Sequence, residues 1–454
     1  MIDLQSHLAK NSLWMILSRF AAQGSAVVFT ILLARRLGSS AFGEYAFIAA
    51  VIFVANALTT FGTDMLLIRE IAAKDDLSGL PMALILQLVL SFLFIAFVWL
   101  FGNWIPNQGD ETITALKIYG LAFIPLAFFT VFTTALRGKQ LMGAYGLLNI
   151  ILPLLQIGAV LLLHEKNLIL LFSFLLFAQI LVVLFAGLLC SFVIPHFWRL
   201  FRLSSLRRGS GHDFLLAFYS SFLKAAPIAW LTLLGMIYQR INIYLLSTMN
   251  GATETGMYAA AFRVVEASKT AHMAVFAALY PAMAQDLSLR PAKRESNVRA
   301  EETTASPGFN TSETSIRYAR PSPAITYLTS SAIVISFSLF LLAKPLTIFL
   351  YGSEYSSSVY VLRILAWILI PFTVNTYLTL SFLASNQERI IGRALIGSLL
   401  GLLILNLWWI PVKGPEGSAW AALIAECIQS FILFVGARAM VRVQGPAHEF
   451  PELS

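Results

Sequence analysis

Twelve apolar stretches follow one another along nearly the whole chain, with only short polar breaks between them. Each is long enough to cross a bilayer, because a helix needs about 20 apolar residues to span a hydrocarbon core of about 30 Å. The short alternating segments that are typical of membrane β-barrels are not seen. The sequence therefore predicts an all-α membrane protein with about twelve transmembrane helices, at 12–34, 42–61, 80–101, 115–136, 144–163, 167–190, 214–246, 256–285, 324–350, 359–384, 391–411 and 417–437.

The positive charges predict how these helices are oriented. Only 12% of the residues are charged, whereas a soluble domain carries about 25%. With the N-terminus inside, the inner side holds 19 of the Lys and Arg residues and the outer side holds 5. Because cytoplasmic loops retain Lys and Arg, both termini are predicted to be cytoplasmic. The net charge of +8 follows from this bias and does not indicate nucleic-acid binding.

Two polar stretches interrupt the apolar pattern. The basic stretch 195–213 divides the predicted helices into six and six, and the stretch 287–322 is rich in Ser, Thr, Glu and Arg, which predicts a disordered cytoplasmic loop. We therefore expect two six-helix lobes, with a basic linker between them and a cytoplasmic tail at the end. The predicted boundaries are 1–194, 195–213, 214–440 and 441–454.

The two lobes share a turn between their first and second helices. At an offset of 213 residues, LLARRLGSSAFGEYA at 32–46 faces LLSTMNGATETGMYA at 245–259. Both segments have two glycines five residues apart, followed by Tyr-Ala. The paired glycines are Gly38 with Gly251 and Gly43 with Gly256.

The fourth helices supply a second match. At an offset of 246, Lys117 faces Arg363 and Pro125 faces Pro371, and one inserted residue later ALRGKQ faces FLASNQ. Because each unit has six spans, both copies run in the same direction through the membrane. A parallel repeat of this kind is a transporter plan, with two bundles around a central cavity and a site near the midplane.

Ionisable residues inside a membrane are costly, so each is a candidate functional residue. Arg19 lies about 10 Å along the first helix, with Gln23 on the same face. Arg19 either extends to the inner interface or faces the cavity. Lys224 lies deeper in the seventh helix, where a cavity role is expected, whereas Arg240 is within two turns of the outer end and has either role.

The eighth helix carries Arg263, Glu266, Lys269 and His272. Arg263 and Glu266 are three residues apart, so they either form a structural ion pair or act separately. Lys269 has no obvious partner in the sequence. His272 is either a packed polar residue or a proton relay.

Acidic residues are sparse in the same predicted spans. Only Glu266 and Glu426 sit well within them, with Asp64 at the inner end of the second, against seven Lys and Arg residues. This cationic surplus favours an anionic ligand, and phosphate groups are the natural candidate. No phosphate loop, metal-ligand cluster or activated nucleophile is recognisable, so we expect neither an enzyme nor a bound metal or cofactor.

The N-terminal segments NSLWMILSRF, LLARRLGSSAFGEYAFIAAV and FGTDMLLIREIA resemble one known family. They are similar to the polysaccharide-exporter branch of the multidrug/oligosaccharidyl-lipid/polysaccharide superfamily, that is, Wzx-type flippases of O-antigen or other repeat units. The resemblance is most specific over residues 10–75. It also extends to the lipid II flippases, through Ser18-Arg19 and the turn Ala34-Arg35-Arg36-Leu37-Gly38.

This resemblance implies a cargo and roles for several residues. The cargo would be an oligosaccharide on undecaprenyl pyrophosphate, flipped from the inner to the outer leaflet of a bacterial plasma membrane, with a polysaccharide polymerase and chain-length proteins as possible partners. Arg19 would bind the pyrophosphate, while Lys224, Arg240, Arg263 and Lys269 are cavity candidates by position and charge. Gating or ion coupling is expected of Asp64, Arg69, Glu70, Glu266 and Glu426.

Three other functions compete with this one. A lipid II flippase and a multidrug cation antiporter would have the same fold, but the antiporter should place carboxylates in its first lobe. A polysaccharide polymerase or ligase should have a large outer loop, whereas every outer connection here is short. Arg35 and Arg36 lie on the outer side against the charge rule, and we expect them to anchor lipid headgroups or to meet the cargo phosphate.

Overall fold

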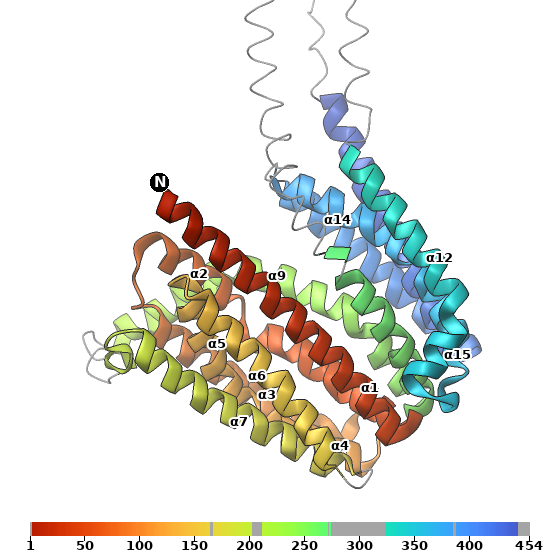
Figure 1. Ribbon diagram of the computed structural model, residues 1–454, viewed down its shortest axis with the longest axis horizontal. Helices are drawn as coiled ribbons and strands as arrows, with labels where there is room; N and C mark the ends of the chain where they lie inside the picture. Colours follow the sequence, from red (N-terminus) through yellow and green to blue (C-terminus); the bar gives the residue numbers. More distant parts are fainter. Residues whose placement is uncertain are drawn as a thin grey trace, which may run out of the picture. The chain divides into compact units, whose positions relative to one another are not determined.

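A computed structural model of the chain describes residues 2–163, 167–201, 211–270, 272–273, 323–384 and 387–443 (Figure 1). Side chains are described from Phe20 onward in the first helix and, in the seventh, chiefly from Ala229 onward. These ranges are almost entirely helical and contain no strand, as the apolar pattern predicts. The predicted loop at 287–322 lies outside the described residues.

The described chain is a series of α-helices with three short 3₁₀ helices. An unlabelled helix also runs over 252–270. The labelled elements, in order, are α1 (Ile2–Thr60), α2 (Thr63–Lys74), α3 (Leu80–Phe101), η1 (Gly102–Trp104), α4 (Asp110–Gly120), α5 (Phe123–Gly138), α6 (Met142–Leu162), α7 (Leu168–Val193), η2 (Phe197–Phe201), α9 (Gly211–Met249), α12 (Pro323–Tyr351), η4 (Ser353–Tyr355), α13 (Ser358–Ala366), α14 (Leu369–Ala384) and α15 (Glu388–Val443).

Internal contacts divide the chain into two compact units. Unit 1 comprises residues 1–263, 347–357 and 410–415, and unit 2 comprises 264–346, 358–409 and 416–454. Within unit 1, α1 lies alongside α6 and also packs on α9 (Figure 1). The division follows packing rather than the order of the helices, so the lobe boundaries expected from the sequence stay predictions.

Described helices fall on each of the twelve predicted spans, although residues 271 and 274–285 of the eighth span lie outside the described part. Eight helices of the described part are long and apolar enough to cross a membrane. Two of these, α1 and α15, contain a non-helical glycine, Gly38 and Gly414, so each covers two predicted spans. The seventh and eighth predicted spans correspond to α9 and to the helix over 252–270. The chain is therefore a multi-pass helical membrane protein.

The shared glycine turn is present in both copies of the repeat. Gly38 has a φ of 80° and Gly251 has a φ of 92°. Residues with a Cβ avoid this region, because the Cβ approaches the following carbonyl oxygen. At both positions the turn therefore requires glycine, and its recurrence confirms the repeat at the offset of 213.

The fourth and tenth predicted spans are each broken into two helices, which the sequence did not predict. The breaks fall at Leu121–Ala122 and at Trp367–Ile368, 246 residues apart, with Pro125 and Pro371 in the first turn of the helix that follows. Proline is tolerated there because the first N–H groups of a helix have no partner within it.

The two broken helices also share their backbone hydrogen bonds. The matching pairs are Leu121 to Ile118 with Trp367 to Ile364, Ala122 to Tyr119 with Ile368 to Leu365, Leu126 to Ala122 with Phe372 to Ile368, and Leu141 to Leu136 with Gln387 to Phe382. All four keep the offset of 246. The inserted residue that the sequence comparison placed near ALRGKQ is therefore unnecessary.

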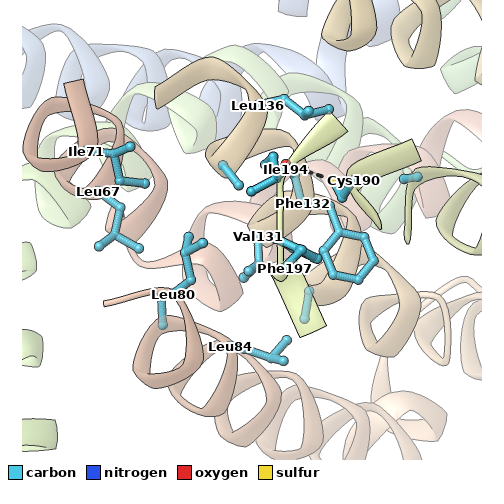
Figure 2. Packing of buried hydrophobic residues seen from close by; sticks show 14 of the residues in the cluster. Leu67, Ile71, Leu80, Leu84, Val131, Phe132, Leu136, Cys190, Ile194 and Phe197 are labelled. Carbon is cyan, nitrogen blue, oxygen red and sulfur yellow. Dashed lines mark hydrogen bonds between the residues drawn. The ribbon is translucent and has the colours of Figure 1, made fainter. Parts of the chain in front are cut away.

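The helix α2 was not expected as a separate element. Leu67 and Ile71 are buried on one side of α2, and the Ile71 side chain lies against Gly138 of α5, where a Cβ would overlap it. Figure 2 shows both residues in a cluster with Val131 and Phe132. The cluster fixes α2 against the N-terminal end of α3 and the C-terminal half of α5 within unit 1.

Candidate functional site

The sequence-predicted cations differ in how much of them is described. The side chains of Arg19 and Lys224, in α1 and α9, lie outside the described part of the structure. Gln23, one turn after Arg19, is half-buried. The roles of Arg19 and Lys224 therefore stay predictions.

Arg240 is buried inside unit 1. Only 6% of the residue is exposed, although it lies nine residues before the end of α9. Its guanidinium carbon lies 4.4 Å from the ring centre of Phe53 in α1 and 5.6 Å from that of Phe262 in the helix over 252–270. Aromatic faces attract cations, more strongly where water is excluded. This placement fits an interior cation better than a side chain that reaches the outer interface.

Lys269 contacts Glu426 in unit 2, a pairing that the sequence did not indicate. The ammonium of Lys269 lies 3.1 Å from Glu426 Oε1 and 4.5 Å from the ring centre of Phe372. The amide of Asn375, in α14, donates to Glu426 Oε2 at 2.8 Å and to its backbone carbonyl at 3.0 Å. Ser430 in turn donates to Asn375 Oδ1 at 2.7 Å. We call Lys269, Glu426, Asn375 and Ser430 the 269–426 cluster.

Other candidates on the eighth helix lie close to this cluster in sequence. His272 is buried, and its Nε2 lies 3.0 Å from the hydroxyl of Thr373 in α14. This contact fits the packed polar role, while the proton-relay role stays a prediction. Arg263 and Glu266 are both half-buried, and whether they pair also stays a prediction.

Three of the gating or ion-coupling candidates, Asp64, Arg69 and Glu70, lie on α2. Asp64 is in its first turn and half-buried, whereas Arg69 and Glu70 are exposed near its middle. The following loop is tied to α5, because Lys139 forms an ion pair with Asp75 at 2.5 Å. The charged residues of α2 therefore precede a loop that is held against the end of α5 within unit 1. Their role in gating stays a prediction.

Arg35 and Arg36 bind the C-terminal ends of two helices, at residues that belong to unit 1. The guanidinium of Arg35 donates to the carbonyls of Leu350, at 2.7 Å, and Phe349, at the end of α12. Arg36 donates to the carbonyls of Leu161, at 3.2 Å, and Leu163, at 2.5 Å, at the end of α6. Cations stabilise helix C-termini, where the last carbonyls have no helical partner. This role was not among the two that the sequence suggested.

Ser39, Glu354 and Tyr355, which lie beside these arginines, were not identified from the sequence. Glu354, in η4, accepts hydrogen bonds from the backbone N–H of Ser39 at 2.6 Å and from its hydroxyl at 2.8 Å. The hydroxyl of Tyr355 donates to the carbonyl of Ala34 at 3.0 Å. Burial and the neighbouring Glu354 carboxylate raise the pKa of Tyr355, so it remains a donor. These contacts join positions more than 300 residues apart, which local sequence patterns do not reveal.

Gly43 and Gly256 contact each other where their helices cross in unit 1. A Cβ on Gly43 would overlap the carbonyl oxygen of Ala252, and a Cβ on Gly256 would overlap that of Ser39. Ser39 and Ala252 are themselves 213 residues apart. The contact is therefore reciprocal, as at a local two-fold axis, and small residues allow the two backbones to meet.

The described intramembrane cations carry hydrogen-bond donors, which suit anionic groups. No group of three His, Cys, Asp or Glu residues that could hold a metal ion occurs in the described ranges. Lys117 donates to Asn103 at 2.9 Å, and Arg363 lies 5.5 Å from the ring centre of Phe340. Each of these cations, like Arg240 and Lys269, has donors of the kind that form charge-assisted hydrogen bonds with phosphate oxygens.

Known proteins with similar sequences and folds handle glycans, lipids and drugs. The chain is 23% identical to the probable low-salt glycan biosynthesis flippase Agl15 of Haloferax volcanii, over 94% of this chain and 82% of the relative. Its fold matches that of the lipid II flippase MurJ in an inward closed conformation, with a TM-score of 0.67, 14% identity, and coverage of 94% of this chain and 87% of MurJ.

A second structural match is a multidrug resistance MATE family transporter of the MOP superfamily in its inward-facing conformation. The TM-score is 0.65 and the identity 16%, over 92% of this chain and 94% of the transporter. Residues 8–286 match the family described as polysaccharide biosynthesis protein, which is more than half of the chain. The chain therefore belongs to the polysaccharide biosynthesis protein family and has the fold of the MOP superfamily transporters.

Proposed function

We propose that this protein is a flippase for lipid-linked oligosaccharides. The cargo is an oligosaccharide repeat unit on undecaprenyl pyrophosphate, which moves from the inner to the outer leaflet of a bacterial plasma membrane. The repeat units serve the synthesis of a surface polysaccharide such as O-antigen, capsule or exopolysaccharide. Family membership and the similarity to a probable glycan biosynthesis flippase support this proposal.

The observation that carries the proposal is the cationic surplus within the membrane. Arg240 is buried against two aromatic rings. Lys269 extends from the eighth helix, with Glu426 as its counter-ion. Because ionisable residues are costly in the bilayer, such residues are candidates for a ligand pathway. A pyrophosphate headgroup matches a pathway of this sign.

Each candidate residue has a proposed role in alternating access. Arg19, Lys224, Arg240, Arg263 and Lys269 bind the pyrophosphate in a central cavity, with Gln23 beside Arg19. Asp64, Arg69 and Glu70 act at the inner mouth, while Glu266 and Glu426 take part in ion coupling. The lipid tail stays in the bilayer during transport. A polysaccharide polymerase and chain-length proteins are the proposed partners that receive the cargo outside.

The second candidate is a lipid II flippase, which the structural match to MurJ favours. Its cargo also carries a pyrophosphate, so the cationic residues suit it equally. A multidrug cation antiporter has the same fold but requires a binding site of the opposite charge. The two glycolipid cargoes differ in the attached sugars, and only an experiment on lipid intermediates separates them.

The deciding experiment is gene deletion followed by analysis of lipid-linked intermediates. The deletion strain should lose surface polysaccharide and accumulate complete, unpolymerised repeat units on undecaprenyl pyrophosphate in the inner leaflet. Accumulation of lipid II with intact surface polysaccharide would instead support the second candidate. Neither intermediate should accumulate if the protein exports drugs.

Complementation of the deletion strain tests the cationic site itself. Arg19→Ala and Lys224→Ala should fail to restore the polysaccharide, although both proteins insert in the membrane. Arg389→Ala is the matched control, because Arg389 is an exposed arginine at the start of α15. Wild-type polysaccharide levels with both cavity variants would contradict the proposed site.

A further inference from the structure

We propose that Lys269 binds a phosphate group of the cargo, and that Glu426 is its ion-pair partner until the cargo arrives. Arrival of the cargo pyrophosphate moves the Lys269 ammonium from the carboxylate to a phosphate oxygen, and Glu426 then takes up one proton from a hydronium ion. The inference rests on the proposed function, because it assigns to the cargo an anionic headgroup that competes with Glu426. Its basis is the geometry of the 269–426 cluster.

The carboxylate is the fixed partner of the pair. Asn375 donates both to Glu426 Oε2 and to the Glu426 backbone carbonyl, so side chain and helix are held by the same amide. Ser430 donates to Asn375 Oδ1 and sets the orientation of that amide. Glu426 therefore has two neighbours that keep it in place when Lys269 leaves.

The lysine is the mobile partner. The Lys269 side chain is 20% exposed and the Glu426 side chain only 8%, so a ligand reaches the ammonium before it reaches the carboxylate. Lysine places its charge at the end of a flexible four-carbon stem. The ring of Phe372, 4.5 Å from the ammonium, offers a face along which the cation can change partners without full rehydration.

Proton uptake follows from the negative charge that Glu426 would carry once Lys269 has moved away. A buried carboxylate without a cation is strongly disfavoured, so the group neutralises instead. One hydronium ion gives its proton to Glu426 Oε1 and becomes water, while Lys269 remains an ammonium throughout. Asn375 continues to donate to Oε2, because a protonated carboxyl group still accepts there. Each pyrophosphate bound thus takes up one proton.

Other titratable groups near Glu426 have to be separated from it. On the eighth helix these are Glu266 and His272, and on α15 the neighbouring thiol is Cys427. On α14, Asn375 contacts Glu426 and Thr373 contacts His272, and neither of these α14 residues titrates. His272 is the main competitor, because histidine changes charge between about pH 5 and pH 8. A His272→Gln variant is therefore the matched control.

The test measures binding of a synthetic polyprenyl diphosphate N-acetylglucosamine to the purified full-length protein in nanodiscs, from about pH 5.5 to about pH 8. The diphosphate of this probe is a diester, so its charge is constant over that range. Uptake of one proton makes wild-type affinity rise as pH falls, by up to about tenfold per pH unit. His272→Gln should keep this dependence.

Variants of the pair separate a functional role from a structural one. Glu426→Gln should bind as tightly as the wild type at low pH, with no pH dependence. The double variant Lys269→Met with Glu426→Met should fold, since apolar pairs often replace buried ion pairs, but should bind at least about tenfold more weakly at low pH. A pH dependence that survives Glu426→Gln, or disappears with His272→Gln, would overturn the inference.

Two further outcomes are equally decisive. A double variant that binds as well as the wild type would show that the pair is only structural. A wild-type protein that binds no diphosphate at any pH would overturn the proposed function itself. Failure of the proposed function can be told apart from failure of the inference, because it is seen with the wild-type protein before any variant is compared.

Discussion

The two copies of the repeat agree in their backbones and differ in their polar side chains. Gly38 and Gly251 both have a positive φ, and Gly43 and Gly256 meet at a reciprocal contact. By contrast, the positions that correspond to Lys269 and Asn375 in the first copy, at the offsets of 213 and 246, are occupied by Asn56 and Phe129. The difference separates architecture from chemistry: the glycines build the scaffold twice, whereas the 269–426 cluster is built once.

The turns at Gly38 and Gly251 show the same difference between a shared backbone and unshared side chains. In the first copy, Arg35 and Arg36 donate to the carbonyl ends of α12 and α6. In the second copy, Thr248 and Met249 take their places, and the carbonyl of Thr248 instead accepts from Asn107 at 2.7 Å. The turn is shared, but each copy satisfies its neighbouring backbone groups with different residues.

The largest expected effect comes from the reciprocal glycine contact. Gly43→Leu and Gly256→Leu should each destabilise the protein by about 3 kcal/mol or more, because the new side chain must displace a backbone carbonyl rather than another side chain. Denaturant unfolding in detergent, followed by tryptophan fluorescence, measures the change. Gly158→Leu in α6 is the control, since a Cβ there meets nothing within 4 Å. Strong destabilisation by only one of the pair would break the symmetry.

The unrepeated 269–426 cluster should show a different pattern. Lys269→Met leaves a buried carboxylate without its cation and should destabilise the protein by about 3 kcal/mol. The double variant Lys269→Met with Glu426→Met should recover most of this loss in the same unfolding assay. No recovery would mean that the cluster contributes to stability through contacts other than the ion pair.

A smaller effect is expected at the left-handed turns. Gly38→Ala and Gly251→Ala should each cost about 1–2 kcal/mol, because a Cβ is strained at positive φ. Both values come from the same unfolding measurement. Similar losses would support equivalence of the turns, and a negligible loss at either would show that this turn relaxes to another conformation.

The smallest effects belong to the exposed outer contacts. Arg36→Ala and Glu354→Gln should each cost about 1 kcal/mol, since hydrogen bonds at partly exposed positions contribute modestly. Met249→Ala, at the position that corresponds to Arg36, should be nearly neutral. The comparison fails if Met249→Ala destabilises the protein as much as Arg36→Ala does.

Much of the fold was predictable because it depends on local patterns. Apolar length placed the twelve spans, and glycines at a fixed offset revealed the repeat. The breaks before Pro125 and Pro371 were missed, since a proline in the first turn of a helix and one inside a helix look alike in an apolar stretch. The short helix α2 was missed as well, because its buried side contains little more than Leu67 and Ile71.

The site was less predictable than the fold. The sequence identified Lys269 and Glu426 as intramembrane charges but did not pair them, because they are 157 positions apart. It placed Arg35 and Arg36 on the outer side but did not identify their carbonyl acceptors. Partners of this kind depend on tertiary packing, which hydropathy and charge patterns do not contain.

The most direct test of the central claim is a flipping assay with the purified protein. A fluorescent oligosaccharide on polyprenyl pyrophosphate is placed in proteoliposomes, and a membrane-impermeant quencher measures how much reaches the other leaflet. The account predicts rapid movement with the wild type, and little movement with the stable double variant Lys269→Met with Glu426→Met. Movement at the rate of protein-free liposomes with the wild type would contradict the account.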